Sequence, residues 1–150
     1  MVQKILVVDD EPDIVELVAF NLQAEGYEVI TAANGLDALN AARSSLPDLI
    51  ILDLMLPELD GLSVCEILRR LPSTAPIPVI MLTAWKGELS RIVGLDTGAE
   101  DYITKPFSPR DLVGRVKDAL RARGQKTVVN GEAEAEPGSE PLPRRSAGRG

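Results

Sequence analysis

The chain of 150 residues has no histidine, a single cysteine and few aromatic residues. Without histidine it has no Ser-His-Asp or Cys-His catalytic site, no imidazole ligand for a metal and no residue that can carry phosphohistidine. The lone Cys65 cannot form an internal disulfide, which fits a reducing compartment. These absences leave carboxylates, hydroxyls and amines as the groups from which a reactive site has to be built.

Three further absences bear on location and partners. No run of 18 apolar residues occurs, so we expect no membrane span and no membrane partner. The N-terminal stretch MVQKILVVDDEP becomes acidic too early for a signal peptide, from which we expect a cytoplasmic protein. The net charge is −7, and an excess of negative charge is unfavourable for a nucleic-acid surface. We therefore expect no direct nucleic-acid binding by this chain.

The composition divides the chain into two parts. Residues 1–123 alternate between apolar runs and helical patterns and carry 19 acidic against 12 basic residues. Residues 124–150 are rich in Gly, Pro, Glu and Ala, contain no aromatic residue and have balanced charge. Such a segment buries too little apolar surface to offset the entropy lost on ordering. We expect one folded domain over 1–123 and a disordered tail or linker over 124–150.

Five short apolar runs alternate with helical patterns in the folded part. Strands are expected at 4–8, 27–31, 48–52, 78–82 and 101–104. Helices are expected at 12–25, 35–45, from about 60, at 87–97 and at 108–121. Pro12 suits a first helical turn, Gly26 a helix end and Ser108 an N-cap. This alternation predicts an α/β fold, a doubly wound, five-stranded parallel sheet with five helices on its two faces.

Polar residues follow four of the five expected strands. In an open parallel sheet, ligands bind beyond the carboxyl ends of the strands. The residues at those ends are Asp9, Asp10 and Glu11 after the first strand, Asp53 after the third, Thr83 after the fourth and Lys105 after the fifth. A divalent cation between the carboxylates would make their repulsion tolerable. Oxygen ligands without histidine or thiolate favour Mg²⁺ over zinc.

Each of these residues also has a purely structural explanation. Asp9 and Asp10 can cap the following helix and complement its dipole. Asp53 can cap a turn, and Thr83 and Lys105 are ordinary residues at strand ends. Chance placement of all of them at separate strand ends is improbable, so together they favour a site.

Four segments resemble, in order, the motifs of response-regulator receiver domains of two-component signalling. They are ILVVDDEPD, DLIILDLMLPELDG, VIMLTAW and GAEDYITKPFSPRDL. The resemblance covers about residues 2–122. It is closest to the subfamily whose receivers are joined to winged-helix DNA-binding domains. It implies a flavodoxin-like fold, shared with chemotaxis receivers, whose strand order is 2-1-3-4-5.

The resemblance also implies a role for each acidic residue of the site. Asp53 would be the nucleophile and would form an aspartyl phosphate. Asp10 and Asp53 would bind Mg²⁺, for which Mn²⁺ is a substitute, and Asp9 would act partly through water. The backbone oxygen of Met55 would complete the protein ligands.

The remaining roles concern the phosphoryl group and the switch. Lys105 would pair with the phosphoryl oxygens, and a cis peptide bond before Pro106 would aim it. Thr83 would move its hydroxyl to the phosphoryl group, and Tyr102 would turn inward behind it. Trp85 would flank the entrance with Met55 and slow the loss of phosphate, unless it merely covers the start of the fourth helix. Glu11 receives no family role, and a charge at a helix N-terminus is the better interpretation.

As a receiver, the chain would be a switch that catalyses only its own phosphorylation and slow dephosphorylation. The donor would be a sensor histidine kinase, since this chain has no histidine, and small acyl phosphates would serve in vitro. The output surface would be helix 4, strand 5 and helix 5, which would also form a homodimer. There we expect Arg91 to pair with Asp111 and Asp101 with Arg115, across a two-fold axis.

Three other classes are compatible with parts of this pattern. A flavodoxin needs a hydroxyl- and Gly-rich phosphate loop after the first strand, where this chain has DDEPD. A haloacid-dehalogenase phosphatase needs a second Asp two residues after the nucleophile, where this chain has Met55. A receiver that is not phosphorylated would lack one of the acids, Thr83 or Lys105. We expect either a free-standing receiver with a tail or a receiver from a longer regulator.

Overall fold

A computed structural model describes residues 2–84 and 98–133, with side chains placed up to residue 124. The chain divides into two compact units, residues 1–119 and 120–150. The first unit holds all the strands and the candidate site. Trp85, Arg91 and the helix predicted at 87–97 lie outside the described residues, as do residues 134–150 of the predicted tail.

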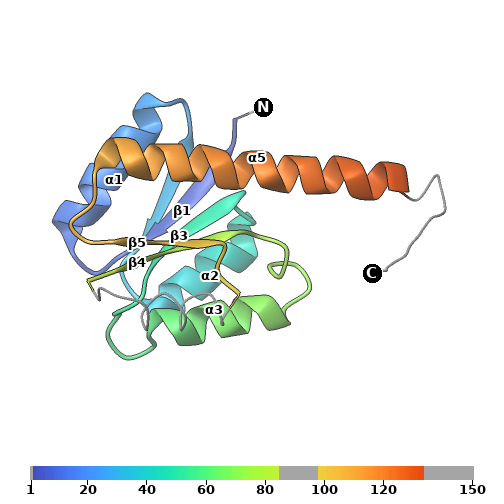
Figure 1. Cartoon of the computed structure of the whole chain (residues 1–150). Coiled ribbons are helices and arrows are strands. Elements are labelled where there is room, and N and C mark those ends of the chain that lie inside the picture. Colours follow the sequence, from blue (N-terminus) through green and yellow to red (C-terminus); the bar gives the residue numbers. More distant parts are fainter. Residues whose placement is uncertain (1, 85–97, 134–150) are drawn as a thin grey trace. The chain divides into compact units, whose positions relative to one another are not determined.

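The described elements form a five-stranded parallel sheet in the order β2-β1-β3-β4-β5 (Figure 1). The strands are β1 (Lys4–Val8), β2 (Glu28–Ala32), β3 (Leu49–Asp53), β4 (Val79–Thr83) and β5 (Asp101–Thr104). The helices are α1 (Pro12–Ala24), α2 (Gly35–Ser45), α3 (Gly61–Arg70) and α5 (Pro109–Ala133). The predicted fold class and strand order are confirmed, and the fourth expected helix, at 87–97, falls in the stretch that is not described.

Some boundaries differ from those expected. β2, β3 and β4 each begin and end one residue later, so Asp53 and Thr83 are the last residues of their strands. The last helix does not end near Arg121 but continues to Ala133 and so passes the predicted boundary at 123. The sequence interpretation placed a break at Gly124, yet a glycine inside a helix costs only about 1 kcal/mol relative to alanine and need not end it.

Local signals explain several element ends. Pro12 occupies the first turn of α1, and Gly26 follows its end with a φ of 94°. Such a positive φ favours glycine and ends a helix in the left-handed conformation. Asp60 caps α3 by accepting a hydrogen bond from the Ser63 N–H, and Ser108 accepts one from the Asp111 N–H, as expected for an N-cap.

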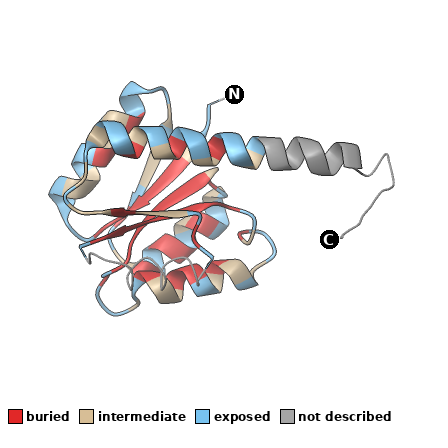
Figure 2. Cartoon of the chain, in the orientation of Figure 1, coloured by how far each residue is buried: buried red, intermediate tan, exposed pale blue. Residues whose placement is uncertain are grey.

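The sheet is buried on both faces (Figure 2). Alternate strand residues pack against α2 and α3 on one face, where the core contains Leu6, Val8, Ile50, Leu52, Met81, Ala42 and Leu68. The intervening residues Ile5, Val7, Ile51, Ile80 and Leu82 are also fully buried, as are Val18 and Leu22 of α1 and Leu112 and Val116 of α5. Burial on both faces explains why the central strands are continuous apolar runs.

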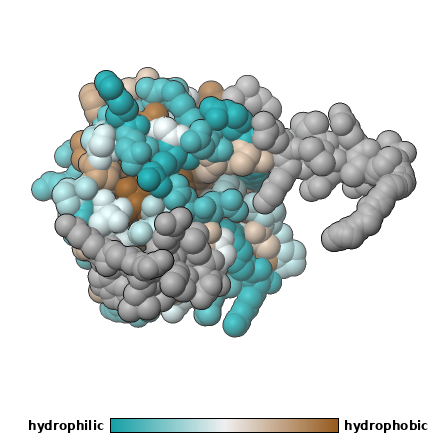
Figure 3. Space-filling view, in the orientation of Figure 1, coloured by the Kyte–Doolittle hydropathy of each residue, from teal (hydrophilic) through white to brown (hydrophobic). Residues whose placement is uncertain are grey.

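The outer surface of the described residues is mainly hydrophilic on the face seen in Figure 3, with smaller hydrophobic areas between. The large apolar side chains that are exposed are Val2, Leu17, Phe20, Leu36, Leu46 and Met55. Within residues 2–84 and 98–133, no helix is both long and apolar enough to cross a membrane.

Candidate functional site

The sheet brings the predicted residues to one edge. Asp9 directly follows β1, Asp53 ends β3, and Thr83 ends β4. Lys105 directly follows β5, and its N–H donates a hydrogen bond to the Thr83 carbonyl at 2.7 Å. Because all strands are parallel, these ends lie on the same side of the sheet.

A single ammonium group connects two buried carboxylates. Lys105 Nζ lies 2.9 Å from Asp9 Oδ2 and 3.4 Å from Asp53 Oδ2. The Asp9 and Asp53 side chains are only 0% and 4% exposed, so these contacts are little screened by water. Glu11 approaches the same Nζ at 3.8 Å from a largely exposed position. One positive charge therefore faces three negative charges.

The second oxygen of each buried carboxylate is held by the backbone. Asp9 Oδ1 accepts a hydrogen bond from the Glu11 N–H at 2.9 Å, and Asp53 Oδ1 accepts one from the Met55 N–H at 3.0 Å. Asp9 Oδ2 is buried and, despite its closeness to Lys105, receives no hydrogen bond of acceptable geometry from the described residues. Asp9 thus keeps an oxygen with capacity to bind a cation.

Three carboxylates converge closely enough to bind one metal ion. Asp9, Asp10 and Asp53 each offer an oxygen, and these oxygens lie within 4.8 Å of one another. Asp9 and Asp53 are buried, whereas Asp10 is exposed to solvent. Three carboxylate oxygens without a nitrogen or sulfur donor fit a hard cation such as Mg²⁺, which usually keeps several of its waters. The donor set therefore fits the predicted cofactor.

Burial and charge shift two pKa values at this edge. Burial raises the pKa of Asp53 most strongly, and the neighbouring charge of Asp9 raises it further, against the lowering effects of the Met55 N–H and of Lys105. Burial by itself would lower the pKa of Lys105, but the close contact with the Asp9 carboxylate and the charges of Asp53, Asp9 and Glu11 raise it overall. Lys105 is thus held as a cation, while ionised Asp53 is disfavoured without a further positive charge.

The raised pKa of Asp53 determines how the acidic cluster responds to pH when no cation is bound. Between the ordinary carboxyl pKa and the raised value, Asp53 binds its proton in the folded state but not in the unfolded state. By linkage, this group's contribution to stability therefore declines as pH rises through that interval. A cation competes with the same proton, so affinity for the cation should fall as pH drops through it.

Replacing Asp10 by asparagine should therefore stabilise the metal-free protein. It removes one charge from a cluster with surplus negative charge, and we expect the melting temperature in chelator to rise by about 2–4 °C. Millimolar Mg²⁺ should raise the melting temperature of the wild type by binding the folded state, and should do so much less in Asp10→Asn. Thermal unfolding with Mg²⁺ and with chelator measures both effects. Equal melting temperatures of the wild type under the two conditions would contradict a cation site.

The other predicted residues of the site have defined places. Thr83 is 1% exposed and pairs with Thr104 of β5. It directly follows Leu82, the residue of β4 that pairs with Asp53. Tyr102 is half-buried in β5 and packs against the core. The Lys105–Pro106 peptide bond is cis, as expected. The switching roles of Thr83 and Tyr102 stay predictions, because they concern a movement.

A second charged cluster joins β5 to α5 within the chain. Arg115 Nη1 lies 2.9 Å from both carboxylate oxygens of Asp101, and Arg115 Nε lies 3.1 Å from Asp111 Oδ2. These groups are exposed or half-buried, and their contacts raise the pKa of Arg115 in spite of partial burial. Three residues predicted to form ion pairs between subunits thus already pair within one chain.

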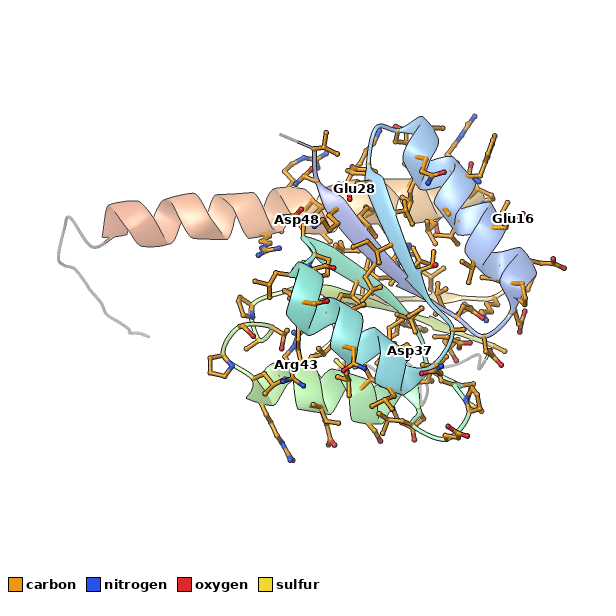
Figure 4. All side chains as sticks on the ribbon, turned by 180° about the vertical axis from the view of Figure 1, so that it is seen from behind. Glu16, Glu28, Asp37, Arg43 and Asp48 are labelled. Atoms are coloured by element: carbon orange, nitrogen blue, oxygen red, sulfur yellow. The ribbon has the colours of Figure 1, made fainter. Side chains whose placement is uncertain are left out.

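A cavity of about 680 Å³ opens beside the buried carboxylates. Asp9 and Asp10 line it together with Val15, Glu16 of α1 and Asp37 of α2. Figure 4 labels Glu16 on α1 and Asp37 on α2. The approach to the site from this side is therefore acidic.

Sequence reasoning missed two contributors. Glu11 received no role in the site, yet its carboxylate reaches Lys105. Gly61 was noted only as the start of a helix, although it packs against the backbone of Asp53. The place of Glu11 in the acidic run was a signal for its part in the site. The part of Gly61 depends on tertiary packing, which sequence spacing does not reveal.

Comparison with known proteins identifies this class of fold and site. The family described as response regulator receiver domain matches residues 5–117, and the chain belongs to this family. Receiver domains of this family are signalling proteins of phosphorylation-dependent two-component systems and not ordinary enzymes. The resemblance seen in the sequence motifs is thus confirmed.

Particular relatives agree with this assignment. The alkaline phosphatase synthesis transcriptional regulatory protein PhoP of Bacillus subtilis (strain 168) is 53% identical over 121 residues, which are 81% of this chain and 50% of that protein. A crystallised candidate response regulator from Chloroflexus aurantiacus J-10-fl is 40% identical with a TM-score of 0.78, over 81% of this chain and 99% of that one. The chemotaxis response regulator CheY4 of Vibrio cholerae is 33% identical with a TM-score of 0.75, over 79% of this chain and 98% of that one.

The relative from Bacillus is longer than the matched region. The chain spans about half the length of that curated protein. Its name describes a transcriptional regulatory protein, so the comparisons do not support the expectation that no nucleic acid is bound directly, which stays a prediction.

Proposed function

We propose that this chain is a phosphorylation-dependent switch in which Asp53 accepts a phosphoryl group from a sensor histidine kinase. The observation that carries the proposal is the convergence of Asp9, Asp10 and Asp53 within reach of one cation, with Lys105 against two of them. The membership of the receiver family supports it. Because this chain contains no histidine, the phosphohistidine of the proposed donor would lie outside it.

Each residue has a distinct part in the transfer. A carboxylate oxygen of Asp53 forms a bond to phosphorus while the bond from phosphorus to the donor's imidazole nitrogen breaks, and that nitrogen takes up a proton. Asp9, Asp10 and Asp53, with the Met55 carbonyl, would hold Mg²⁺. When bound, this cation would neutralise charge on the transferred group. Lys105, already cationic in the site, would pair with a phosphoryl oxygen.

The alternatives make different demands on the same edge. A flavin phosphate would meet Asp9, Asp10 and Glu11 after β1, all negative, where a flavodoxin-type site needs hydroxyls and glycines. A phosphatase of the haloacid-dehalogenase type would need an acid at position 55, where the exposed side chain is that of a methionine. The acidic edge with one lysine therefore favours phosphoacceptor chemistry.

Incubation with acetyl phosphate tests the proposal directly. With Mg²⁺ the intact mass should increase by one phosphoryl group, the adduct should be labile to alkali, and peptide mapping should place it on Asp53. With chelator the gain should disappear. Lowering the pH through the raised pKa of Asp53 should slow the gain, because the protonated acid is not nucleophilic. A chain that gains no phosphoryl group from acetyl phosphate or from any histidine kinase would contradict the proposal.

The output surface in this proposal includes β5 and α5. The Asp101–Arg115–Asp111 cluster lies there, and exposed single ion pairs contribute little, so only a network combined with apolar contacts would hold a dimer. Because Arg115 is already paired within its own chain, a dimer must either exchange these partners or share them. The pairing of Arg91 with Asp111 belongs to the same proposal.

Beryllofluoride with Mg²⁺ should therefore shift the wild type from monomer towards dimer in sedimentation at tens of micromolar protein. Replacing Arg115 by alanine should weaken that dimer about tenfold, since it removes a residue that binds two carboxylates. Arg43→Ala is the matched control. Arg43 is an exposed arginine of α2, an element outside the proposed output surface, and is labelled in Figure 4. A wild type that stays monomeric in both states would refute the dimer.

A further inference from the structure

Two helices beside the site begin with a buried glycine, Gly35 in α2 and Gly61 in α3. Neither has a positive φ, so neither is explained by backbone conformation. Alanine would form the first helical turn better than glycine does. What distinguishes both positions is the space around them, because a side chain there would meet other backbone.

At Gly61 the neighbouring backbone is that of the phosphoacceptor. A β-carbon built on Gly61 would lie 2.2 Å from the Asp53 carbonyl oxygen and 2.8 Å from Leu54 Cα. This backbone is fixed from the other side, since Asp53 pairs with Leu82 of β4 and the Leu54 N–H donates to the Leu82 carbonyl at 2.7 Å. The backbone of Asp53 and Leu54 therefore cannot move aside readily, so a methyl group added at Gly61 has to displace the start of α3 and the loop before it.

At Gly35 the neighbouring backbone belongs to the loop between β3 and α3. A β-carbon there would lie 2.4 Å from the Leu59 carbonyl oxygen and 2.9 Å from Val64 Cγ2. The loop between β3 and α3 is also closed on itself, because the Gly61 N–H donates to the Leu54 carbonyl at 3.0 Å. Glu58 within it has a φ of 66°, a conformation that a non-glycine residue adopts at a cost.

We propose that Gly61 and Gly35 are positioning residues, whose missing side chains let α3 and α2 close on the 54–60 loop and fix Met55 beside Asp53. The inference rests on the proposed function, since it assigns the Met55 carbonyl to the cation. The loop bears on the acceptor through the hydrogen bond from the Met55 N–H to Asp53 Oδ1. Two glycines outside the charged cluster thus set the geometry of the site.

The consequence is a preference between cations. Mg²⁺ requires nearly ideal octahedral geometry at short distances, whereas Ca²⁺ accepts irregular sets of oxygens at longer ones. Relieving the contact of a methyl group at position 61 requires a shift of about 1 Å, and a misplacement of that size can cost on the order of 10²-fold in rate. The shift should weaken Mg²⁺ binding much more than Ca²⁺ binding, which simple loss of stability would not do.

The test compares Gly61→Ala and Gly35→Ala with the wild type and with Gly114→Ala. Gly114 is the control, a helical glycine of α5 whose added β-carbon would meet no atom within 4 Å. Calorimetric titration of each full chain with Mg²⁺ and then with Ca²⁺, below its melting temperature, gives the dissociation constants. We expect the Mg²⁺ constant of Gly61→Ala to rise at least about tenfold and its Ca²⁺ constant by less than about threefold, with a smaller effect of the same kind in Gly35→Ala.

The rate of phosphorylation by acetyl phosphate at saturating Mg²⁺ is the second readout. It should fall on the order of 10²-fold in Gly61→Ala and stay unchanged in Gly114→Ala. If the wild type binds Mg²⁺ and gains phosphate while both variants match it, the inference is wrong and the proposed function stands. If the wild type does neither, the proposed function itself fails. If Gly61→Ala does not fold, the same measurements on Gly35→Ala decide whether the inference holds. If neither variant folds, the inference is overturned, because the glycines would then be needed for folding as a whole.

Discussion

Replacing Asp53 by asparagine should abolish the gain of a phosphoryl group from acetyl phosphate. The amide lacks a carboxylate oxygen that can attack phosphorus, and loss of a nucleophile lowers rates by on the order of 10³-fold or more. The fold should survive the change. Burial and the charge of Asp9 raise the pKa of Asp53, so its ionised form costs more free energy in the folded protein than in the unfolded chain. Asparagine removes that cost, and the melting temperature in chelator should rise.

Asp13→Asn provides the matched control for this experiment. Asp13 is an exposed acid in the first turn of α1, so the same chemical change there leaves the buried carboxylates in place. Intact-mass spectrometry over time should show the wild-type rate for Asp13→Asn and no adduct for Asp53→Asn. Phosphorylation of Asp53→Asn at the wild-type rate would place the acceptor elsewhere. A variant that is inactive because it is unfolded would be recognised by its melting curve.

Much of this site is predictable because a parallel sheet imposes a simple rule. Each strand is an apolar run, and the residue that ends the run lies at one common edge. The strand order, by contrast, came from the family resemblance, because alternation of strands and helices is compatible with more than one order. The apolar pattern also left strand ends uncertain by one residue, which is why Asp53 and Thr83 belong to β3 and β4 and do not follow them.

Other features depend on distances between side chains that no sequence pattern specifies. The sequence indicated that Lys105 and the acids would meet, but not that Lys105 would lie closer to Asp9 than to Asp53. Nor did it indicate that Arg115 binds Asp101 within one chain, since charges spaced along two elements are equally compatible with pairing across a dimer. The extension of α5 to Ala133 was missed because composition argued for disorder after residue 123.

Replacing Lys105 by methionine should destabilise the metal-free protein strongly. Methionine keeps much of the side-chain volume but leaves Asp9, which has a fully buried side chain, without its cation at 2.9 Å. Removing one partner of a buried ion pair typically costs about 3–5 kcal/mol. The same change at Lys117, whose ion pair with Glu25 is half exposed, should cost no more than about 1 kcal/mol. Denaturant unfolding in chelator at neutral pH measures both losses.

The pH dependence of this loss follows from the raised pKa of Lys105. A lysine with a raised pKa stabilises the fold fully below its unfolded pKa and ceases to do so only as pH rises through the folded value. The difference between wild type and Lys105→Met should therefore persist through neutral and mildly alkaline pH. It should narrow in acid, where Asp53, whose pKa is raised, takes up a proton and no longer needs the ammonium. It should also narrow in Mg²⁺, because a divalent cation replaces the missing positive charge.

Adding Asp9→Asn to Lys105→Met should restore much of the lost stability, because the unpaired buried charge disappears together with its partner. The coupling energy from this double-mutant cycle measures the Asp9–Lys105 interaction itself. Asp13→Asn in the Lys105→Met background should restore nothing, since Asp13 is exposed and outside the cluster. Equal losses for Lys105→Met and Lys117→Met, or losses at Lys105 that Asp9→Asn does not reverse, would mean that the ammonium does not hold the acidic cluster together in the absence of metal.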